Sequence, residues 1–390
     1  MLARARRDFL IVDPHPHCNW DFRVEKLAPS QIEILRKTGL AESVLPKLTP
    51  AKRQWVVRLG RFVHKRTDEQ YGFYYNGLVN TFRDLIPADR FVLDKVAGIR
   101  TSGDRQTLTL SNGEEISARL VVLATGPNHA LRESLGIERS VLSACHSISI
   151  GYDIKPTGRD FDFDGLTCFP ENPHRTDPIS YLTLFRVGDV MRANLFVYRE
   201  LKDPWLRTFR DAPKETALAA LPGLRNILGD HEIVGQIKFR PVDLYETAGY
   251  VRPGVVLVGD AFASSCPAAG TGSNKVLTDV ERLCNHYIPR WLATAGMDST
   301  KIAMFYADPN KRACDALSRA RSLDMRAVST DKSMRWRLQR LVRHARGYSR
   351  GVVEYVLGSA SIHPKVPLAY SKGASLNDRV YQQPRHDGAA

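Results

Sequence analysis

The clearest pattern of hydrophobic and polar positions lies in the second half of the sequence. Val255 to Val258 form a short, mostly β-branched run that is typical of a buried strand, and Gly259 and Asp260 end it. A loop of small residues containing Pro267 follows, and the segment 270–274, Gly-Thr-Gly-Ser-Asn, opens a predicted helix. An acid at the end of a strand can accept hydrogen bonds from sugar hydroxyls. Glycines at a helix N-terminus allow backbone N–H groups to approach an anionic or electron-rich ligand.

Shorter patterns earlier in the chain predict further strands. The apolar run 9–12 ends at Asp13. The segment 52–68 alternates polar and apolar residues as a strand or hairpin does, whereas 71–87 has apolar residues at helical spacing. Residues 91–123 predict a β-meander and then a parallel-sheet strand, which ends in Ala-Thr-Gly.

A second group of strands is predicted between residues 143 and 245. Alternating segments at 147–154, 181–186, 191–198 and 232–239 suit an antiparallel sheet, with a helix over 213–228 that Pro222 breaks in two. Some aromatic and polar residues here are candidates for lining a cavity, although each alone fits an ordinary core or edge position better. They are His146, Phe169, Tyr181, Phe185, Arg192 and Tyr198.

Helical segments dominate the C-terminal part. Helices are predicted over 281–292, 301–306, 311–328 and 333–346. In the last of these the apolar residues share one face and most arginines lie on the other. We expect the apolar face to pack onto its own domain, and docking on a membrane surface is the alternative. The polar tail 371–390 is predicted to be disordered.

Composition narrows the class of protein. The chain has 390 residues, 43% hydrophobic and 25% charged, which suits a globular protein of two joined domains with no bilayer-spanning run. The six cysteines show no CxxC spacing and predict reduced thiols, and the histidines show no spacing typical of a metal site. Of the net charge of +14, a local excess arises in residues 311–350, which contain twelve Lys or Arg and three Asp. This suits a solvated face better than nucleic acid.

The segment around Asp260 resembles the GD motif of FAD-dependent aromatic-ring hydroxylases, the family that includes the ubiquinone-biosynthesis hydroxylases. That family reads G-D-A-x-H-x-x-x-P-x-x-G-x-G. The matching residues here are Gly259, Asp260, Ala261, Pro267, Gly270 and Gly272, and Ala263 replaces the usual histidine. The resemblance implies that Asp260 binds the ribityl chain of FAD. It also implies that the backbone of five residues faces the flavin ring, namely Gly270, Thr271, Gly272, Ser273 and Asn274.

The same resemblance extends to positions outside the GD motif. It implies that Arg23, before a predicted helix that ends at Gly39, reaches the FAD pyrophosphate, and that the backbone at Val96 holds the adenine. Thr125 and Gly126 would lie beside the dinucleotide. Many of these hydroxylases have an aspartate at the place of Thr125, and its replacement leaves room for a reductase or another oxidoreductase.

Asp13 is a candidate for binding the adenosine ribose, because in dinucleotide-binding units such an acid ends the second strand. The GxGxxG turn that should precede it is absent from the sequence before Asp13. Either the true start lies upstream of Met1, which we favour, or the protein is genuinely shortened. We therefore expect an α/β fold: a truncated Rossmann-like FAD-binding domain (1–142 and 246–300), an antiparallel-sheet substrate domain (143–245) and C-terminal helices (301–370).

The scattered cysteines indicate a cytoplasmic protein, and the resemblance implies an FAD-dependent oxidoreductase. The leading hypothesis is a monooxygenase that hydroxylates an aromatic or lipophilic small molecule, with NAD(P)H as the candidate electron donor. A flavin-dependent dehydrogenase or reductase is the first alternative, and a non-catalytic remnant that lacks the pyrophosphate loop is the second. The flavin would carry the chemistry, so the sequence assigns no catalytic residue and no metal ligand.

Overall fold

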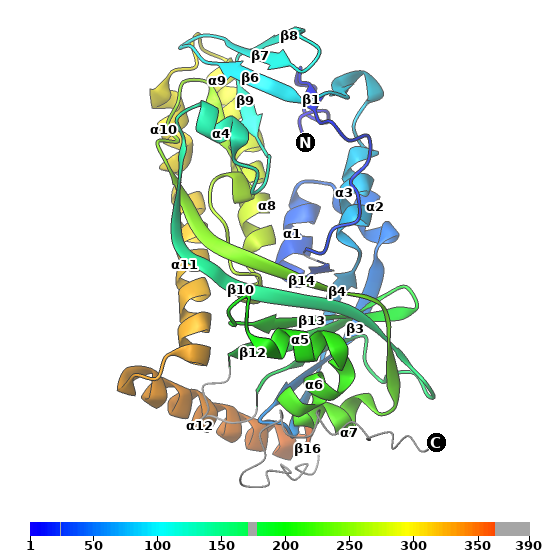
Figure 1. The fold of residues 1–390 in the computed structure, drawn as a ribbon. Coiled ribbons are helices and arrows are strands. Elements are labelled where there is room, and N and C mark those ends of the chain that lie inside the picture. The colour runs from blue at the N-terminus through cyan, green and yellow to red at the C-terminus, as the bar shows by residue number, and fades with distance from the viewer. Residues whose placement is uncertain (24, 171–177, 363–390) are drawn as a thin grey trace, which may run out of the picture.

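A large sheet crosses the middle of the molecule and separates two groups of smaller elements (Figure 1). The computed structural model describes residues 1–23, 25–170 and 178–362. On one side of the sheet lie the short parallel strands and helices α1–α4 and α8–α10, and on the other lie α5–α7 and α12. The tail predicted to be disordered lies outside the described residues.

The large sheet has nine strands among the described residues. In spatial order they are β14 (His231–Ala248), β10 (Glu138–Pro156), β13 (Val190–Val197), β12 (Ile179–Val187), β11 (Gly165–Cys168), β3 (Thr49–Arg58), β4 (Phe62–Gly72) and β16 (Ala360–Ile362), and β2 (Lys26–Leu27) also pairs with β4. Neighbouring strands are antiparallel except β11 and β3, which are parallel. The sheet is thus nearly, but not wholly, the antiparallel one that the sequence predicts.

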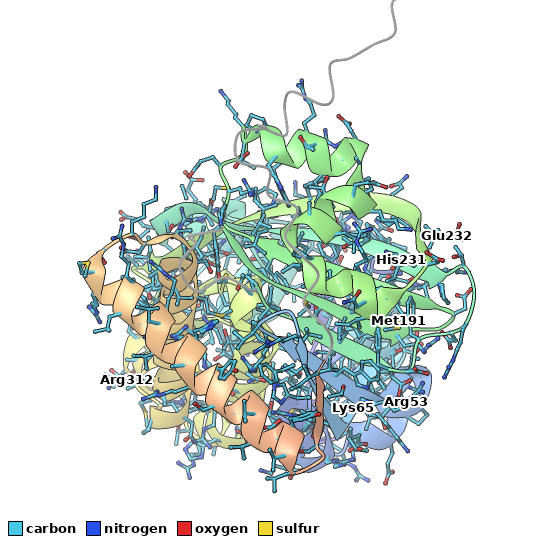
Figure 2. The ribbon with its side chains drawn as sticks, turned by 90° about the horizontal axis from the view of Figure 1, so that it is seen from below. Arg53, Lys65, Met191, His231, Glu232 and Arg312 are labelled. Atoms are coloured by element: carbon cyan, nitrogen blue, oxygen red, sulfur yellow. The ribbon has the colours of Figure 1, made fainter. Side chains whose placement is uncertain are left out.

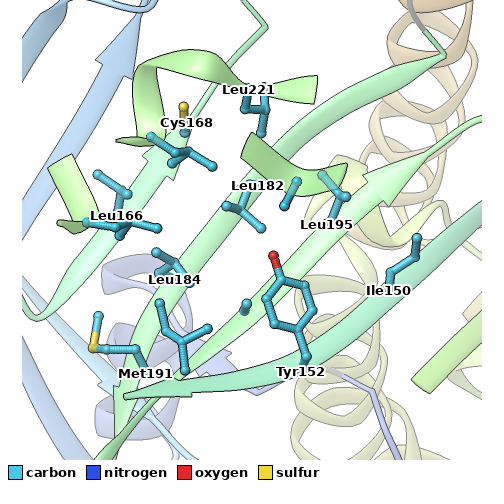
Figure 3. Packing of buried hydrophobic residues seen from close by; sticks show 14 of the residues in the cluster. Ile150, Tyr152, Leu166, Cys168, Leu182, Leu184, Met191, Leu195 and Leu221 are labelled. Carbon is cyan, nitrogen blue, oxygen red and sulfur yellow. The ribbon is translucent and has the colours of Figure 1, made fainter. Parts of the chain in front are cut away.

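The main hydrophobic core lies between this sheet and three short helices, α5 (Pro204–Asp211), α6 (Pro213–Ala220) and α7 (Arg225–Leu228). Alternate residues of the central strands face this core because successive side chains of a strand point to opposite faces. Figure 3 shows this packing, in which Ile150, Tyr152, Leu182 and Leu195 come together from three strands. Every residue of β13 is buried, so the opposite face of the sheet is covered as well.

Two separate pairs of parallel strands lie beyond that opposite face. β1 (Ile11–Val12) pairs with β5 (Phe91–Val92), and β9 (Val121–Leu123) pairs with β15 (Val255–Leu257). A separate three-stranded antiparallel meander lies between β5 and β9 in the sequence. Its strands are β6 (Val96–Arg100), β7 (Gln106–Leu110) and β8 (Glu115–Ala118).

Helices surround these small sheets and continue toward the C-terminus. They are α1 (Pro29–Lys37), α2 (Ala41–Val44), α3 (Tyr75–Arg83), α4 (Ala130–Ser134), α8 (Gly272–Arg282), α9 (Ile288–Leu292) and α10 (Ser299–Tyr306). Two longer helices follow, α11 (Pro309–Thr330) and α12 (Met334–Val356). In Figure 1, α11 runs along one side of the molecule and connects the part above the sheet to α12 below it. None of the helices within the described ranges is long and apolar enough to cross a membrane.

The α/β fold class is confirmed, with small parallel sheets, one large and mostly antiparallel sheet, and a C-terminal helical region. The helix predicted over 71–87 is shorter than expected. β4 continues to Gly72, because its end pairs with β2 and β3, and α3 begins only at Tyr75.

The expectation that the C-terminal amphipathic helix packs its apolar face onto its own domain is wrong. Along α12 only Arg340 and Gly351 are buried, whereas Met334, Leu338 and Leu341 are exposed. Periodicity defines the apolar face of a helix, but it does not say which way that face points.

Candidate functional site

The turn after β15 is held tightly by its surroundings. Gly259 has a φ of +58°, and its N–H donates to the buried Asp279 carboxylate over 2.9 Å. A Cβ at Gly259 would lie 2.8 Å from Cγ2 of Val276 in α8, so glycine allows the turn to approach that helix. The next residue, Asp260, accepts a 2.6 Å hydrogen bond from the Tyr245 hydroxyl on its backbone carbonyl. Its carboxylate remains 40% exposed and available to a ligand.

The loop then leads to the N-terminus of α8. A short 3-10 turn, Pro267–Ala269, ends at Gly270, which has a φ of +64° and open space where a Cβ would stand. Thr271, the N-cap residue, does not cap α8 with its side chain, because its hydroxyl is 2.7 Å from Ser318 Oγ. The N-terminus of α8, with its free N–H groups and the partial positive charge of the helix dipole, thus follows directly after the open space at Gly270. This arrangement suits an electron-rich ligand.

Buried ion pairs attach α8 to α11. Lys311 Nζ lies 2.8 Å from Asp279 and 3.1 Å from Asp315, and Lys275 lies 3.3 Å from Asp315. Burial raises the pKa of Asp279, and Lys311 opposes this rise. Because Asp279 also accepts from Gly259, the charge cluster connects α11, α8 and the turn at Asp260 in one network.

Arg23 lies beside Asp260, as the resemblance suggests for two residues that hold one ligand. Its Nη1 is 3.8 Å from Asp260 Oδ2, and its Nε donates to Asp21. Arg240 of β14 binds the other oxygen of Asp21, and its guanidinium also donates to the Phe22 carbonyl over 2.9 Å. The loop before β2 is therefore fastened to the large sheet next to Asp260.

Tyr75 of α3 and Cys18 lie near Arg23. The Arg23 guanidinium lies over the Tyr75 ring, 5.5 Å from its centroid. Burial raises the pKa of Tyr75, Arg23 lowers it, and the charges of Cys18 and Asp260 raise it further. Burial likewise raises the pKa of Cys18, which the charge of Asp13 raises further and those of Arg83 and Arg23 lower. The charge of Asp260 thus acts on Tyr75, and the charge of Asp13 acts on Cys18.

Asp13 ends β1, as predicted, but its carboxylate already has partners. Oδ2 is paired with Arg83, and Oδ1 accepts the backbone N–H of His15 over 2.9 Å. A ribose hydroxyl bound at Asp13 would therefore share the carboxylate with Arg83 or displace it.

The remaining predicted residues lie around the same parallel strands. Val96 is on β6 and pairs with Leu110 in the meander. Thr125 and Gly126 follow β9, and Gly126 has a φ of +58° with open space where a Cβ would stand. The fully buried Arg132 connects this turn to the turn at Asp260. Its guanidinium donates to the carbonyl of Ala261 over 2.6 Å and to that of Asn128 over 2.9 Å.

The large sheet contacts the loop after Asp260 directly. The Tyr181 hydroxyl donates to the Ala268 carbonyl over 2.6 Å, and the Thr247 hydroxyl donates to the Phe262 carbonyl over 2.9 Å. Tyr198 and Ser147 approach the Cys266 thiol at 3.9 and 3.5 Å. The predicted candidates Tyr181 and Tyr198 thus lie at this loop.

Arg192, another predicted candidate, occupies a buried charged triad on the same face of the sheet. Its Nε donates to Glu25 over 2.7 Å, and its Nη1 donates to Asp153 over 3.1 Å. Burial raises the pKa of Glu25 to about 7 although Arg192 lowers it, and the nearby Asp153 carboxylate adds to the rise. One guanidinium faces two carboxylates here, so the triad gains a proton readily near neutral pH.

The same face of the sheet also carries buried polar atoms without hydrogen-bond partners. They are Nδ1 of His146, Oγ of Ser149 and Oδ1 of Asn194, and all three residues are at least nine-tenths buried. Ser149 and Asn194 lie on the adjacent strands β10 and β13, diagonally across one pair, because Ser149 faces Phe196 and Gly151 faces Asn194. Buried polar atoms normally find partners, so this part of the sheet is suited to a polar group from a ligand.

The other two predicted candidates have ordinary surroundings. Phe185 is fully buried. Phe169 packs against Tyr181 with 5.4 Å between ring centroids and under the Arg58 guanidinium.

Sequence reasoning missed several residues of this region. Tyr75, Cys18, Arg83, Arg132 and Tyr245 were not candidates, since each reaches the site from an element whose place depends on long-range packing. The sequence contains no clear signal for Arg132, which stands next to Glu133 in the short helix α4.

Comparisons with known proteins identify the fold. No protein-family model matches the sequence, and none of the curated proteins matches it. Solved structures do match. The p-nitrophenol 4-monooxygenase PnpA from Pseudomonas putida DLL-E4 aligns with a TM-score of 0.67 at 14% identity, over 91% of each chain. HpxO from Klebsiella pneumoniae, solved with FAD and uric acid, aligns with a TM-score of 0.61 at 14% identity, over 86% of each chain.

The flavin-dependent halogenase CmlS aligns with a TM-score of 0.61 at 16% identity, over 88% of this chain and 66% of its own. The chain therefore has the fold shared by flavin-dependent monooxygenases and halogenases.

Proposed function

We propose that this protein is an FAD-dependent oxidoreductase. The observation that carries the proposal is the placement of the exposed Asp260 carboxylate beside Arg23 and before the N-terminus of α8, where the loop between them contacts the large sheet. The fold, which similar solved structures share with flavin-dependent monooxygenases and halogenases, supports the proposal.

The residues of this region fit FAD in three respects. The Asp260 carboxylate can accept hydrogen bonds from ribityl hydroxyls. Gly126 and Gly270 have positive φ and open space where a Cβ would stand, so a flat ligand can approach their backbone. The N-terminus of α8 can stabilise negative charge on the edge of the flavin ring. Arg23 would hold the pyrophosphate, Asp13 the adenosine ribose, Val96 the adenine, and residues 270–274 the flavin ring.

We propose that the reaction is the monooxygenation of an aromatic or lipophilic small molecule. When bound, the flavin supplies the redox chemistry, with NAD(P)H as the electron donor. The substrate would lie between the flavin and the large sheet. There the sheet would exclude water from the flavin, and Ser149 and Asn194 would offer hydrogen bonds to the substrate. A phenol or a similar hydroxyl-bearing ring suits these partners, because it can donate to Asn194 Oδ1 and exchange a hydrogen bond with Ser149 Oγ.

A flavin-dependent dehydrogenase or reductase is the second candidate. Thr125 favours it, because a neutral hydroxyl at the end of β9 cannot supply the charge that many hydroxylases place there. The Thr125 hydroxyl is also directed to the Asn128 carbonyl, 3.4 Å away.

We also propose that one more strand, which none of the described residues supplies, lies between β1 and β9. Among the described strands, β1 pairs only with β5 and β9 only with β15, so each parallel pair has an edge without a strand neighbour. A strand followed by a glycine-rich turn would join the two pairs into one parallel sheet and would supply amide groups to the pyrophosphate.

These proposals are tested by enzyme assays with two versions of the protein. One is the 390-residue chain, and the other is extended by the in-frame codons upstream of Met1. We expect the extended version to be yellow, to retain FAD and to consume NADPH faster when candidate phenols are added. FAD binding without substrate-stimulated oxygen uptake would favour the dehydrogenase. If neither version binds FAD, the flavin proposal fails.

A further inference from the structure

Helix α12 lies across one end of the molecule with its polar side turned toward the protein. Figure 2, which views the molecule from below, shows this helix (orange) lying over the surface. The two buried positions, Arg340 and Gly351, are eleven residues apart, which is three helical turns, so both face the body. An amphipathic helix that packed only for its own fold would bury the opposite face.

Specific contacts fix this orientation. Arg340 donates to the Asp331 carbonyl over 2.7 Å, and Glu354 is paired with the buried His64 of β4. At Gly351 the helix approaches so closely that a Cβ would lie 2.6 Å from the Phe62 ring. β16, which follows α12, pairs with β4 and holds the C-terminal end. The helix is therefore docked in one rotation rather than free to turn.

Apolar side chains cover most of the face of α12 that points away from the protein, from Met334 to Ala345 and again from Val352 to Val356, with the exposed Ser349 between. Apolar residues recur at intervals of three or four within 334–345 and within 352–356, with exposed fractions of 74% at Met334, 63% at Leu338 and 76% at Val356. The exposed apolar stripe consists of Met334, Leu338, Leu341, Val342, Ala345, Val352 and Val356. Hydrophobic side chains exposed in such a row mark an interaction surface.

Arginines border the stripe. Arg335, Arg343 and Arg346 follow one side of it and Arg337 the other, and all four are exposed, whereas Arg350 is paired with Glu354. The one acidic residue of the helix, Glu354, is turned inward to His64. A row of apolar side chains bordered by arginines is the pattern of helices that lie in the interface of an anionic bilayer.

We propose that α12 docks the protein on the surface of an anionic lipid bilayer. The exposed apolar stripe enters the boundary between headgroups and acyl chains, and the bordering arginines bind lipid phosphates. This proposal does not depend on the flavin chemistry proposed above, because the residues that would contact the bilayer all lie on α12, away from Asp260 and Arg23.

Charge decides between this occupant and a second copy of the chain. Two α12 helices packed stripe to stripe would bring their exposed arginines together, with Glu354 in each turned away from the contact. The positive charges of these arginines would repel each other across such a contact. The phosphates of an anionic bilayer would instead neutralise them.

Flotation of the full chain with lipid vesicles tests the proposal. One set of vesicles contains phosphatidylcholine alone, and the other contains phosphatidylcholine and phosphatidylglycerol in equal amounts. We expect binding to the anionic vesicles only, weakened by added salt. Leu338→Asp should lower the affinity for anionic vesicles about tenfold or more, because it removes a leucine that would be buried in the bilayer and places a negative charge there. Replacing both Arg343 and Arg346 by Gln should weaken binding and reduce its dependence on salt.

The matched control is Leu317→Asp. Leu317 is a half-exposed leucine on α11, and the substitution makes the same charge change outside α12. It should leave vesicle binding unchanged, and both aspartate variants should unfold at the wild-type temperature. The proposal is overturned if wild type does not bind, if it binds both kinds of vesicle equally, or if Leu338→Asp binds as wild type does. It is also overturned if sedimentation shows a dimer that Leu338→Asp dissociates.

Discussion

Arg23 and Asp260 lie side by side, with 3.8 Å between Nη1 and Oδ2, although they come from opposite halves of the sequence. Arg23 belongs to the loop that follows β1, and Asp260 to the turn that follows β15. Their proximity brings the candidate for the pyrophosphate next to the candidate for the ribityl chain. A single extended ligand can therefore contact both.

Replacement of Arg23 tests whether this proximity serves a ligand. Arg23→Ala should lower the affinity for FAD about tenfold, because a hydrogen-bonded contact with a charged group is lost. The control is Arg240→Ala, since Arg240 binds the same Asp21 carboxylate but has no contact with Asp260. Fluorescence titration with FAD measures both variants. If both variants lose the same FAD affinity, the loop held by Asp21 determines binding, and Arg23 makes no contact of its own with FAD.

Gly270→Ala tests the open backbone before α8. A methyl group there finds space in the protein, so stability should fall only by the cost of a left-handed alanine, about 1 kcal/mol. The same methyl group would stand where we place the flavin ring, so FAD affinity should fall strongly.

Gly188→Ala is the matched control for Gly270→Ala, because Gly188 has a φ of +59° and equally open space, but on the turn between β12 and β13. Chemical denaturation should show equal losses of stability, and the titration should show a loss of FAD affinity at Gly270 alone. If both alanine variants bind FAD as wild type does, the flavin ring does not lie at Gly270.

Lys311→Met should destabilise the protein by roughly 3–5 kcal/mol, because it leaves the buried Asp279 carboxylate without its cation. The double variant Lys311→Met with Asp279→Asn should recover part of this loss, since the unpaired charge is gone. Urea unfolding of the two variants measures the difference. A double variant no more stable than the single one would show that packing, and not charge, determines the cost.

The Glu25 triad predicts a dependence of stability on pH. The folded-state pKa of Glu25, about 7, lies above its ordinary value of 4.5, so the folded state holds a proton that the unfolded state releases. This contribution is complete below pH 4.5 and is lost as the pH rises through 7, by at most roughly 3 kcal/mol. Glu25→Gln, which resembles the protonated form, should flatten this part of the stability profile. An unchanged profile in Glu25→Gln would assign the pH dependence to another group.

The sequence predicted those parts of the fold that depend on local patterns. The strand before Gly259, the meander after Phe91 and the strands around Ile150 and Leu195 are alternating or continuous apolar segments, and the structure confirms them. The GD motif pointed to Asp260 because its residues are consecutive in the chain. Of the predicted site residues, Arg23, Asp260 and Gly270 lie around one turn and loop, while Asp13 lies at the end of β1, where it is paired with Arg83.

The parts that were missed depend on contacts between distant segments. The Arg192 triad unites β13, β10 and the start of β2, and Arg132 joins two turns that no local pattern relates. The orientation of α12 is set by Phe62 and His64 on β4, so the helical periodicity alone could not show that its apolar face points outward.

The most direct test of the central claim is an FAD titration of Asp260→Asn, in the 390-residue chain and in its upstream-extended form. Asp189→Asn is the control, because Asp189 is an exposed carboxylate on the turn between β12 and β13 that pairs with Lys155. We predict that FAD binds to wild type and to Asp189→Asn with equal affinity, and to Asp260→Asn at least about tenfold more weakly. Equal FAD affinity in Asp260→Asn and wild type, or no binding by any version, would contradict the proposed flavin site.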